Sequence, residues 1–157
     1  YVVARSPYYS NWNKEKGIKP ADVYRVYALD RISDIQDTGK TFKMKKDFDI
    51  NHYFEGCCGV ITSDEPIQRI VLLAYGGFAD YLRSLPLHES QREIEGDDES
   101  TLFEYHLKPT FDFYQLILAQ GDQVEVLEPE SVRDEMRNFA KNMLDYYTWE
   151  EDKPCKE

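Results

Sequence analysis

Two arginines and a tyrosine at alternate positions form the pattern in this sequence that is best suited to chemistry. If residues 24–32 form a strand, Arg25, Tyr27 and Arg31 lie on one side of it, together with Leu29. Planar guanidinium groups bind phosphates and carboxylates, and a neighbouring ring can stack on a base or on the guanidinium itself. The spacing therefore predicts a binding face for an anion.

Residues 24–32 can also be interpreted as a purely structural strand. In that case the strand is half-buried, and its arginines form ion pairs with nearby carboxylates. The candidate partners are Asp30, Asp34 and Asp37. The two interpretations differ in whether the positive charges are free for an outside ligand.

The pattern Arg-x-aromatic-x-Leu-Asp-Arg-Ile at residues 25–32 resembles a strand of the WYL domain of bacterial transcriptional regulators. Tyr1-Val2-Val3 lies where the Trp-Tyr-Leu of that domain ends, with Val2 in place of Leu and the Trp falling before the first residue. Residues 46–50, 85–91 and 124–130 resemble the linker and the C-terminal extension of the same regulators. We identify the chain as similar to the C-terminal part of a WYL domain followed by that extension.

The resemblance implies an α+β fold in two parts. Residues 1–45 would form the C-terminal half of an Sm-like or SH3-like β-barrel, and residues 66–148 a ferredoxin-like extension, joined by a linker at 46–65. We expect residues 149–157 to be a flexible tail. Because the chain opens without Met, directly in a strand-like run, we expect a fragment that lacks the upstream barrel strands and the helix-turn-helix.

The pattern along the chain agrees with this division. In the first part we predict strands at 1–4 and 24–28 with a continuation through 32–37, a polar loop through 11–20, and a short helix within 49–54. In the second part we predict strands at 67–75, 90–95, 101–107 and 124–127, and helices at 78–85 and from Pro109-Thr110 to before Gly121. This order, βαββαβ, is that of a ferredoxin-like sandwich. A last helix, with Pro129 at its first position, carries an apolar stripe through about residue 147.

For function, the resemblance implies a ligand-sensing and dimerisation module of a bacterial regulator. The ligand is an anionic effector, either single-stranded nucleic acid or a nucleotide-like anion, and the missing helix-turn-helix would bind promoter DNA. The expected ligand-binding residues are Tyr1, Arg5, Arg25, Tyr27 and Arg31. An open half-barrel exposes strand edges, so we also expect a homodimer.

Six further residues are weaker candidates for the same role. Tyr8, Tyr9 and Trp12 follow the first strand and can stack on bases, or can instead cover the open end of the barrel. His88, Gln91 and Arg92 lie where the family often has His-Pro-Ser-Gln, and a structural turn explains them equally well. The acidic turn at 93–99 lacks the ligand spacing of a calcium loop.

Composition restricts the class of protein further. The net charge of −11 argues against a protein that coats nucleic acid without sequence preference. The charge is unevenly distributed, however. Residues 1–50 hold ten Lys and Arg against seven Asp and Glu, whereas residues 51–157 hold nine Lys and Arg against twenty-three Asp and Glu. A local anion site in the basic part is compatible with the overall charge, since distant charges are screened beyond ~8 to 10 Å. The sequence has no apolar run of membrane-spanning length and no signal peptide, so we expect a cytoplasmic protein without a membrane contact.

We expect no enzyme, no cofactor and no metal site. His52, His88 and His106 lack metal-ligand spacing, and no phosphate-binding glycine loop of the Walker type is present. Cys57, Cys58 and Cys155 are odd in number and two are adjacent, so we expect reduced thiols. Two alternatives to the sensor remain: a structural dimerisation module without a ligand, and an enzyme that uses His52, Cys57 and Cys58.

Overall fold

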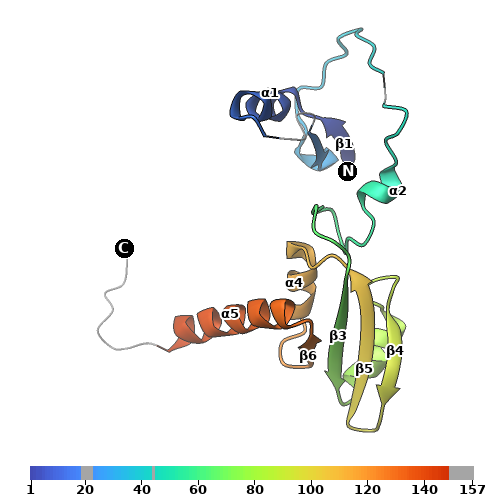
Figure 1. Cartoon of the computed structure of the whole chain (residues 1–157), viewed down its shortest axis with the longest axis vertical. Coiled ribbons are helices and arrows are strands. Elements are labelled where there is room, and N and C mark those ends of the chain that lie inside the picture. Colours follow the sequence, from blue (N-terminus) through green and yellow to red (C-terminus); the bar gives the residue numbers. More distant parts are fainter. Residues whose placement is uncertain (19–22, 44, 149–157) are drawn as a thin grey trace. The chain divides into compact units, whose positions relative to one another are not determined.

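A computed structural model describes residues 1–18, 23–43 and 45–148. The chain divides into two compact units, Tyr1–Asp49 and Ile50–Glu157. The described part contains two antiparallel sheets and five α-helices, which agrees with the predicted mixture of α and β structure (Figure 1).

The first unit is built on a pair of strands with a helix between them. Strand β1 (Val2–Arg5) pairs antiparallel with β2 (Tyr24–Tyr27), and helix α1 (Pro7–Lys16) lies between them in sequence. The predicted strands at 1–4 and 24–28 are therefore confirmed. The described residues of this unit form these two strands alone, so the Sm-like barrel stays a prediction.

The predicted loop through residues 11–20 is wrong, because α1 occupies most of it. Ser6 caps the helix by accepting a hydrogen bond from the Tyr9 amide at 3.5 Å, and Pro7 takes the first helical position. Gly17, with φ of 68°, ends the helix in the left-handed conformation that glycine adopts without strain. Residues 19 and 20, the end of that predicted loop, lie outside the described residues.

The predicted continuation of the second strand is also wrong. Strand β2 ends at Tyr27, and Leu29–Arg31 form a single 3-10 turn, η1, whose amide at Arg31 donates to the carbonyl of Ala28. The alternation that would have put Arg31 on the same face as Arg25 stops at the end of the strand. The chain after the turn is exposed and without regular structure through residue 43.

The second unit follows the predicted order of elements. It contains β3 (Gln68–Tyr75), α3 (Phe78–Ser84), β4 (Arg92–Gly96), β5 (Ser100–Leu107), α4 (Phe111–Leu118) and β6 (Val124–Glu128). The four strands form one antiparallel sheet in the order β4-β5-β3-β6 (Figure 1). The predicted βαββαβ order is thus confirmed, with strand and helix ends that differ by one or two residues.

The core of this unit lies on one face of the sheet. Alternate residues of β3 and β5 point into it, and α3 and α4 contribute the opposing side chains, as period-2 and period-3.6 patterns require. The largest fully buried side chains are Ile70, Leu72, Leu82, Phe103, Tyr105, Leu107, Phe113, Ile117 and Val132. Burial of this apolar surface is the main source of stability of the unit.

A connecting segment leads into the sheet and is fastened to the β5–α4 corner. It begins with the short helix α2 (Ile50–Tyr53), which confirms the helix predicted within 49–54. The Lys108 amide donates to the Gly56 carbonyl at 2.7 Å, and Lys108 Nζ donates to the Ser63 carbonyl at 3.0 Å. The Ile61 amide donates to Asp112 Oδ2 at 2.9 Å. Three hydrogen bonds therefore join residues 56–63 to the β5–α4 corner, two of them through Lys108 and one through Asp112 of α4.

Helix α5 (Glu130–Tyr147) packs on the unit through its first half only. Val132 is fully buried, Met136 packs against the core, and the Phe139 ring meets the Tyr114 ring of α4 at 5.6 Å. The residues from 140 to 148 are all exposed, and the C-terminal part of the helix extends away from α4 and β6 (Figure 1). Pro129 precedes the first helical residue instead of occupying it, as a small correction to the prediction.

A search of the described helices for membrane spans found none with the length and apolar character that crossing a bilayer requires.

Candidate anion-binding site

The first unit brings the predicted site residues together through strand pairing and helix packing. In the β1–β2 register, Ala4 lies opposite Arg25 and Arg5 opposite Tyr24. The amide of Val23 donates to Ser10 Oγ at 3.3 Å, which ties α1 to the start of β2. The side chains of α1 are thereby held beside those of β2.

Arg25 stacks on an aromatic ring of α1. Its guanidinium carbon lies 4.4 Å from the centroid of the Tyr9 ring, within the range of a cation–π contact. The Tyr8 ring meets the Tyr9 ring edge-on at 5.2 Å. The structure thus joins a strong candidate, Arg25, with two that the sequence ranked lower. The contact with the ring uses no hydrogen bond, so the guanidinium N–H groups stay available as donors.

The charge of Arg25 is not consumed by an acid of the described chain. Among the residues that the structure describes, Arg25 makes no ion pair with a carboxylate, and Asp37 accepts a hydrogen bond from the Gly39 amide at 2.8 Å. The structural interpretation, in which Asp30, Asp34 or Asp37 neutralises the arginines, finds no support in these contacts. Arg25 is exposed and can receive an anion from solvent.

The other expected ligand-binding residues differ in how exposed they are and in which elements they lie. Tyr27 shares the exposed side of β2 with Arg25 and is 37% exposed, and Tyr1 is 70% exposed at the start of the chain. Arg5 lies at the exposed end of β1. Arg31 is exposed but sits in η1, off the strand face on which the sequence placed it. Trp12, one turn after Tyr8 and Tyr9 in α1, is 45% exposed.

His88 and Gln91 lie in the second unit and have internal partners. Gln91 Nε2 donates to the Leu82 carbonyl at 2.7 Å, and Gln91 Oε1 accepts from the Leu87 amide at 3.1 Å and from the Tyr105 hydroxyl at 2.8 Å. One amide side chain therefore holds the end of α3, the loop after it and the buried Tyr105. These contacts favour the structural turn over a ligand contact. Arg92 is exposed on β4.

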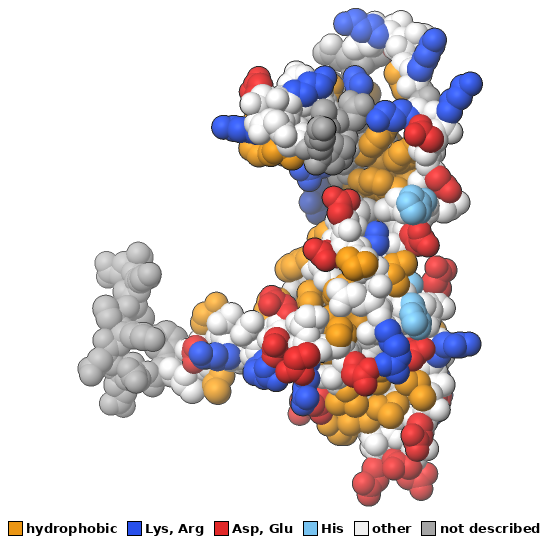
Figure 2. Space-filling model, in the orientation of Figure 1, with side chains coloured by type: hydrophobic (Ala, Val, Ile, Leu, Met, Phe, Trp, Pro, Cys, Tyr) orange, Lys and Arg blue, Asp and Glu red, His pale blue; other side chains and the backbone are white. Residues whose placement is uncertain are grey.

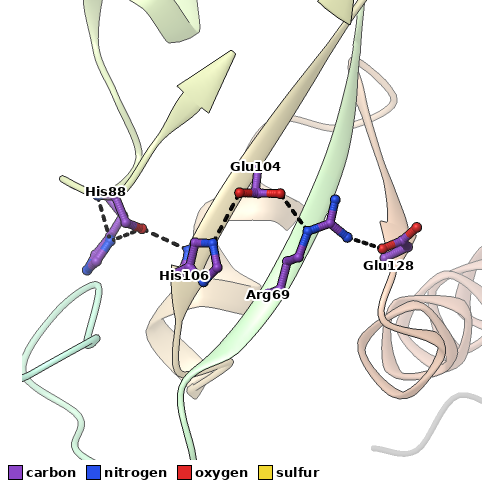
Figure 3. Close-up of polar contacts among 6 residues, drawn as sticks. Arg69, His88, Glu104, His106 and Glu128 are labelled. Atoms are coloured by element: carbon purple, nitrogen blue, oxygen red, sulfur yellow. Dashed lines mark hydrogen bonds and ion pairs between the residues drawn. The ribbon is translucent and has the colours of Figure 1, made fainter. Parts of the chain in front are cut away.

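A polar network that the sequence did not predict crosses the open face of the sheet (Figure 3). Arg69 Nε donates to Glu104 Oε2 at 2.5 Å, and Arg69 Nη1 donates to Glu128. His106 Nε2 lies 3.1 Å from the other Glu104 oxygen. The hydrogen bond from Arg69 is the main reason that the pKa of Glu104 is lowered. Part of the signal was available, since Glu104 and His106 alternate with the buried residues Phe103, Tyr105 and Leu107 in β5, but the sequence does not show that Arg69 of β3 lies beside them.

The network continues to the His88 loop. Ser90 Oγ accepts from the His106 amide at 2.9 Å and lies 2.7 Å from His88 Nδ1. His88 Nδ1 also accepts from the Ser90 amide at 3.2 Å. Partial burial lowers the pKa of His88, against a smaller opposite effect of Glu89. These contacts order the loop between α3 and β4.

The residues of the enzyme alternative, His52, Cys57 and Cys58, lie in α2 and in the segment that follows it. His52 Nδ1 lies 2.8 Å from Glu55, which is exposed with it. Burial raises the pKa of the Cys57 thiol, and raises that of Cys58 to about 12, so both thiols are poor nucleophiles near neutral pH. Both are free thiols, while Cys155 lies outside the described residues. No metal-binding group of three or more His, Cys, Asp or Glu occurs among residues 1–18, 23–43 and 45–148.

Comparison with known proteins adds one family. No curated protein matches this sequence. Residues 66–144, from just before β3 to the C-terminal part of α5, match the WCX domain family and make up half of the chain. This domain forms the C-terminal part of WYL-type regulators, which agrees with the resemblance of the second half of the chain to the extension of those proteins. The chain belongs to the WCX domain family.

Proposed function

We propose that this chain is the effector-binding and dimerisation module of a WYL-type transcriptional regulator, and not an enzyme. In this proposal the second unit is a ferredoxin-like WCX domain and the first unit contributes part of an Sm-like WYL domain. Promoter DNA is bound by a helix-turn-helix of the whole regulator, in the cytoplasm. The family match of residues 66–144 supports the regulatory class.

The observation that supports effector binding is the Arg25–Tyr9 stack. A guanidinium 4.4 Å above a ring, without an ion pair to a described carboxylate, offers a positive charge and a planar surface in one place. Phosphate binds the N–H edge of a guanidinium, and bases stack on aromatic rings. Both are features of single-stranded nucleic acid and of nucleotides, so we propose these as the effector class.

The surface charge supports the same assignment. On the face in view in Figure 2, Lys and Arg side chains are frequent over the first unit, and Asp and Glu side chains are frequent over the second. Residues 1–50 hold ten Lys and Arg against seven Asp and Glu. An anionic effector is attracted to the first unit, where Arg25 lies, and is repelled by the acidic second unit.

The test is a titration of the full chain with a short fluorescent single-stranded DNA at several salt concentrations. Replacing Arg25 by Ala should weaken binding about tenfold and reduce the salt slope by about one, because one phosphate contact is lost. Arg31→Ala should act in the same direction. Arg25→Lys keeps the charge but replaces the planar guanidinium that lies over Tyr9, so this variant should show the parent salt slope and only part of the parent affinity.

Arg137→Ala serves as the matched control, since Arg137 is an exposed arginine of α5 already paired with Asp134. It should leave binding unchanged. If Arg25→Ala and Arg31→Ala both bind like the parent chain, the effector proposal is wrong. A dimer that binds no anion would instead favour the structural dimerisation module.

A further inference from the structure

Helix α1 exposes its aromatic side chains and buries a polar one. Ser10 is the buried residue of this helix, at 4% exposure. Tyr8 is 72% exposed, Tyr9 39% and Trp12 45%. A helix that packs on a core shows the opposite arrangement, with its large apolar side chains on the buried side. At 3.6 residues per turn, Trp12 lies about 160° around the helix from Ser10, so its ring is on the side that faces solvent.

Tyr8, Trp12 and Lys16 follow one another along this side at intervals of four residues, and we call them the α1 row. They lie within about 80° of one another around the helix, and each is about 6 Å further along its axis than the one before. Tyr9 flanks the row near Tyr8, and the Arg25 guanidinium lies 4.4 Å from the Tyr9 ring centroid. The two rings of the row therefore lie between two cations, Arg25 near one end and Lys16 at the other.

The two rings of the row have uncovered faces. The Tyr8 ring meets the Tyr9 ring at 5.2 Å and 87°, an edge-on contact that leaves each of the two rings at least one face without a ring against it. Trp12 makes no hydrogen bond or ring contact with any other residue that the structure describes. Bases of single-stranded nucleic acid stack on such ring faces, while nearby cations bind the phosphates.

The charge around the row favours an anionic occupant. Residues 1–18 hold three cations, Arg5, Lys14 and Lys16, against one anion, Glu15. A partner that covered the rings by apolar contact alone would gain nothing from the cations at the two ends of the row, and charged side chains are depleted at the centre of protein interfaces. A strand in which phosphates alternate with bases meets both the ring faces and the cations.

We propose that Tyr8 and Trp12 form a base-stacking subsite, with phosphates of the same strand on Arg25 and Lys16. This rests on the proposed function for the existence of an anionic effector, and it adds that the effector carries bases next to its phosphates. Two rings offer room for two bases, one on each. Because every base has an aromatic face, the subsite selects for the presence of bases and not for a sequence.

Measuring affinity and salt slope together separates stacking from charge. With a fluorescent single-stranded DNA of about ten nucleotides, Tyr8→Ala and Trp12→Ala should each raise the dissociation constant about tenfold, because one stacked base is lost. Both should leave the salt slope unchanged, since no phosphate contact is removed. Lys16→Ala should instead reduce the slope by about one. Tyr147→Ala, which removes an exposed ring of α5, is the matched control and should change neither quantity.

A DNA backbone without bases is the second probe. An abasic strand of the same length should bind the parent chain at least about tenfold more weakly than the DNA with bases, and Trp12→Ala should not weaken it further. Trp12 also reports the contact directly. In a chain with Trp149→Phe, the emission of Trp12 should be quenched by the DNA with bases and left unchanged by the abasic strand. Circular dichroism shows whether each variant keeps the parent fold.

Three results overturn the inference: parent affinity in both Tyr8→Ala and Trp12→Ala, equally tight binding of the abasic strand, and Trp12 emission that neither strand changes. Rings covered by the chain itself give all three. If Arg25→Ala still weakens binding in that case, the effector proposal stands and only the stacking subsite is wrong. A chain that binds neither strand refutes both proposals.

Discussion

Gln91 is the side chain on which several polar groups of the second unit depend. Its amide bonds to Leu82, Leu87 and the Tyr105 hydroxyl, which is buried. Removing a hydroxyl or an amide from water costs free energy, and without a hydrogen-bond partner in the fold that cost is not offset. The sequence left a ligand contact and a structural turn open for this residue, and its hydrogen bonds fit the structural turn.

Replacing Gln91 by Leu should therefore lower the free energy of unfolding by about 2–4 kcal/mol, because three hydrogen bonds are lost while the volume is nearly kept. Urea denaturation of the full chain, followed by circular dichroism, measures it. Arg92→Ala, at an exposed neighbouring position, should change it by less than about 0.5 kcal/mol. Equal effects of the two variants would contradict the supporting role.

His88 gives the fold a pH dependence with a defined sign. Burial lowers its pKa in the folded state below the usual 6.5, and Nδ1 accepts hydrogen bonds that a protonated ring cannot accept. The unfolded chain therefore binds the proton first as the pH falls. The contribution of His88 to stability is present above pH 6.5 and is lost as the pH drops through the lowered folded-state pKa.

The measurement is the urea midpoint between pH 7.5 and pH 5. The parent chain should lose more stability over this range than His88→Asn, whose side-chain oxygen can still accept from the Ser90 amide but does not titrate. If the urea midpoints of the two proteins fall equally with pH, protonation of His88 is not coupled to unfolding.

At the scale of elements, the second unit was predictable because each element carries a strong local pattern. Strand β3 is a continuous apolar run from Ile70 to Ala74, and α4 follows Pro109-Thr110 and ends before Gly121. The first unit was harder. Helix α1 mixes Tyr, Trp, Ser, Asn and Lys without an apolar stripe, so only its ends, Ser6-Pro7 and Gly17, mark it as a helix.

Because a loop was predicted where α1 lies, only part of the site could be predicted. Arg25, Tyr27 and Tyr9 were all named from residue type and spacing, but the stack of Arg25 on Tyr9 needs a helix between the two strands. Arg31 was misplaced because a strand pattern does not show where the strand ends and a 3-10 turn begins. The network around Arg69 depends on strand order, which no local pattern specifies.

At the scale of the whole molecule, the chain consists of two units with an exposed stretch before the second one. Residues 33–43 have no regular structure and are exposed throughout, whereas Arg69 and Lys108 lie within or directly after strands of the sheet. Proteases cleave exposed, irregular backbone first. Brief trypsin digestion should therefore cut after Lys40 or Lys43 at least about ten times faster than within 66–144.

Mass spectrometry of the early fragments identifies the first cuts. Replacing Lys40, Lys43, Lys45 and Lys46 by Gln should delay the appearance of a fragment that contains the WCX domain, because the last two are exposed lysines directly downstream. First cuts inside β3 or β5 would show that the second unit opens as readily as the stretch before it.

The three hydrogen bonds that fasten residues 56–63 to Lys108 and Asp112 have a mechanical consequence. They tether the chain to the β5–α4 corner several residues before it enters β3. A force transmitted along the backbone from upstream is therefore borne first at that corner and at the first turn of α4, before it reaches β3. A conformational change transmitted to the WCX domain through residues 56–63 therefore acts first on α4, the helix that α5 contacts.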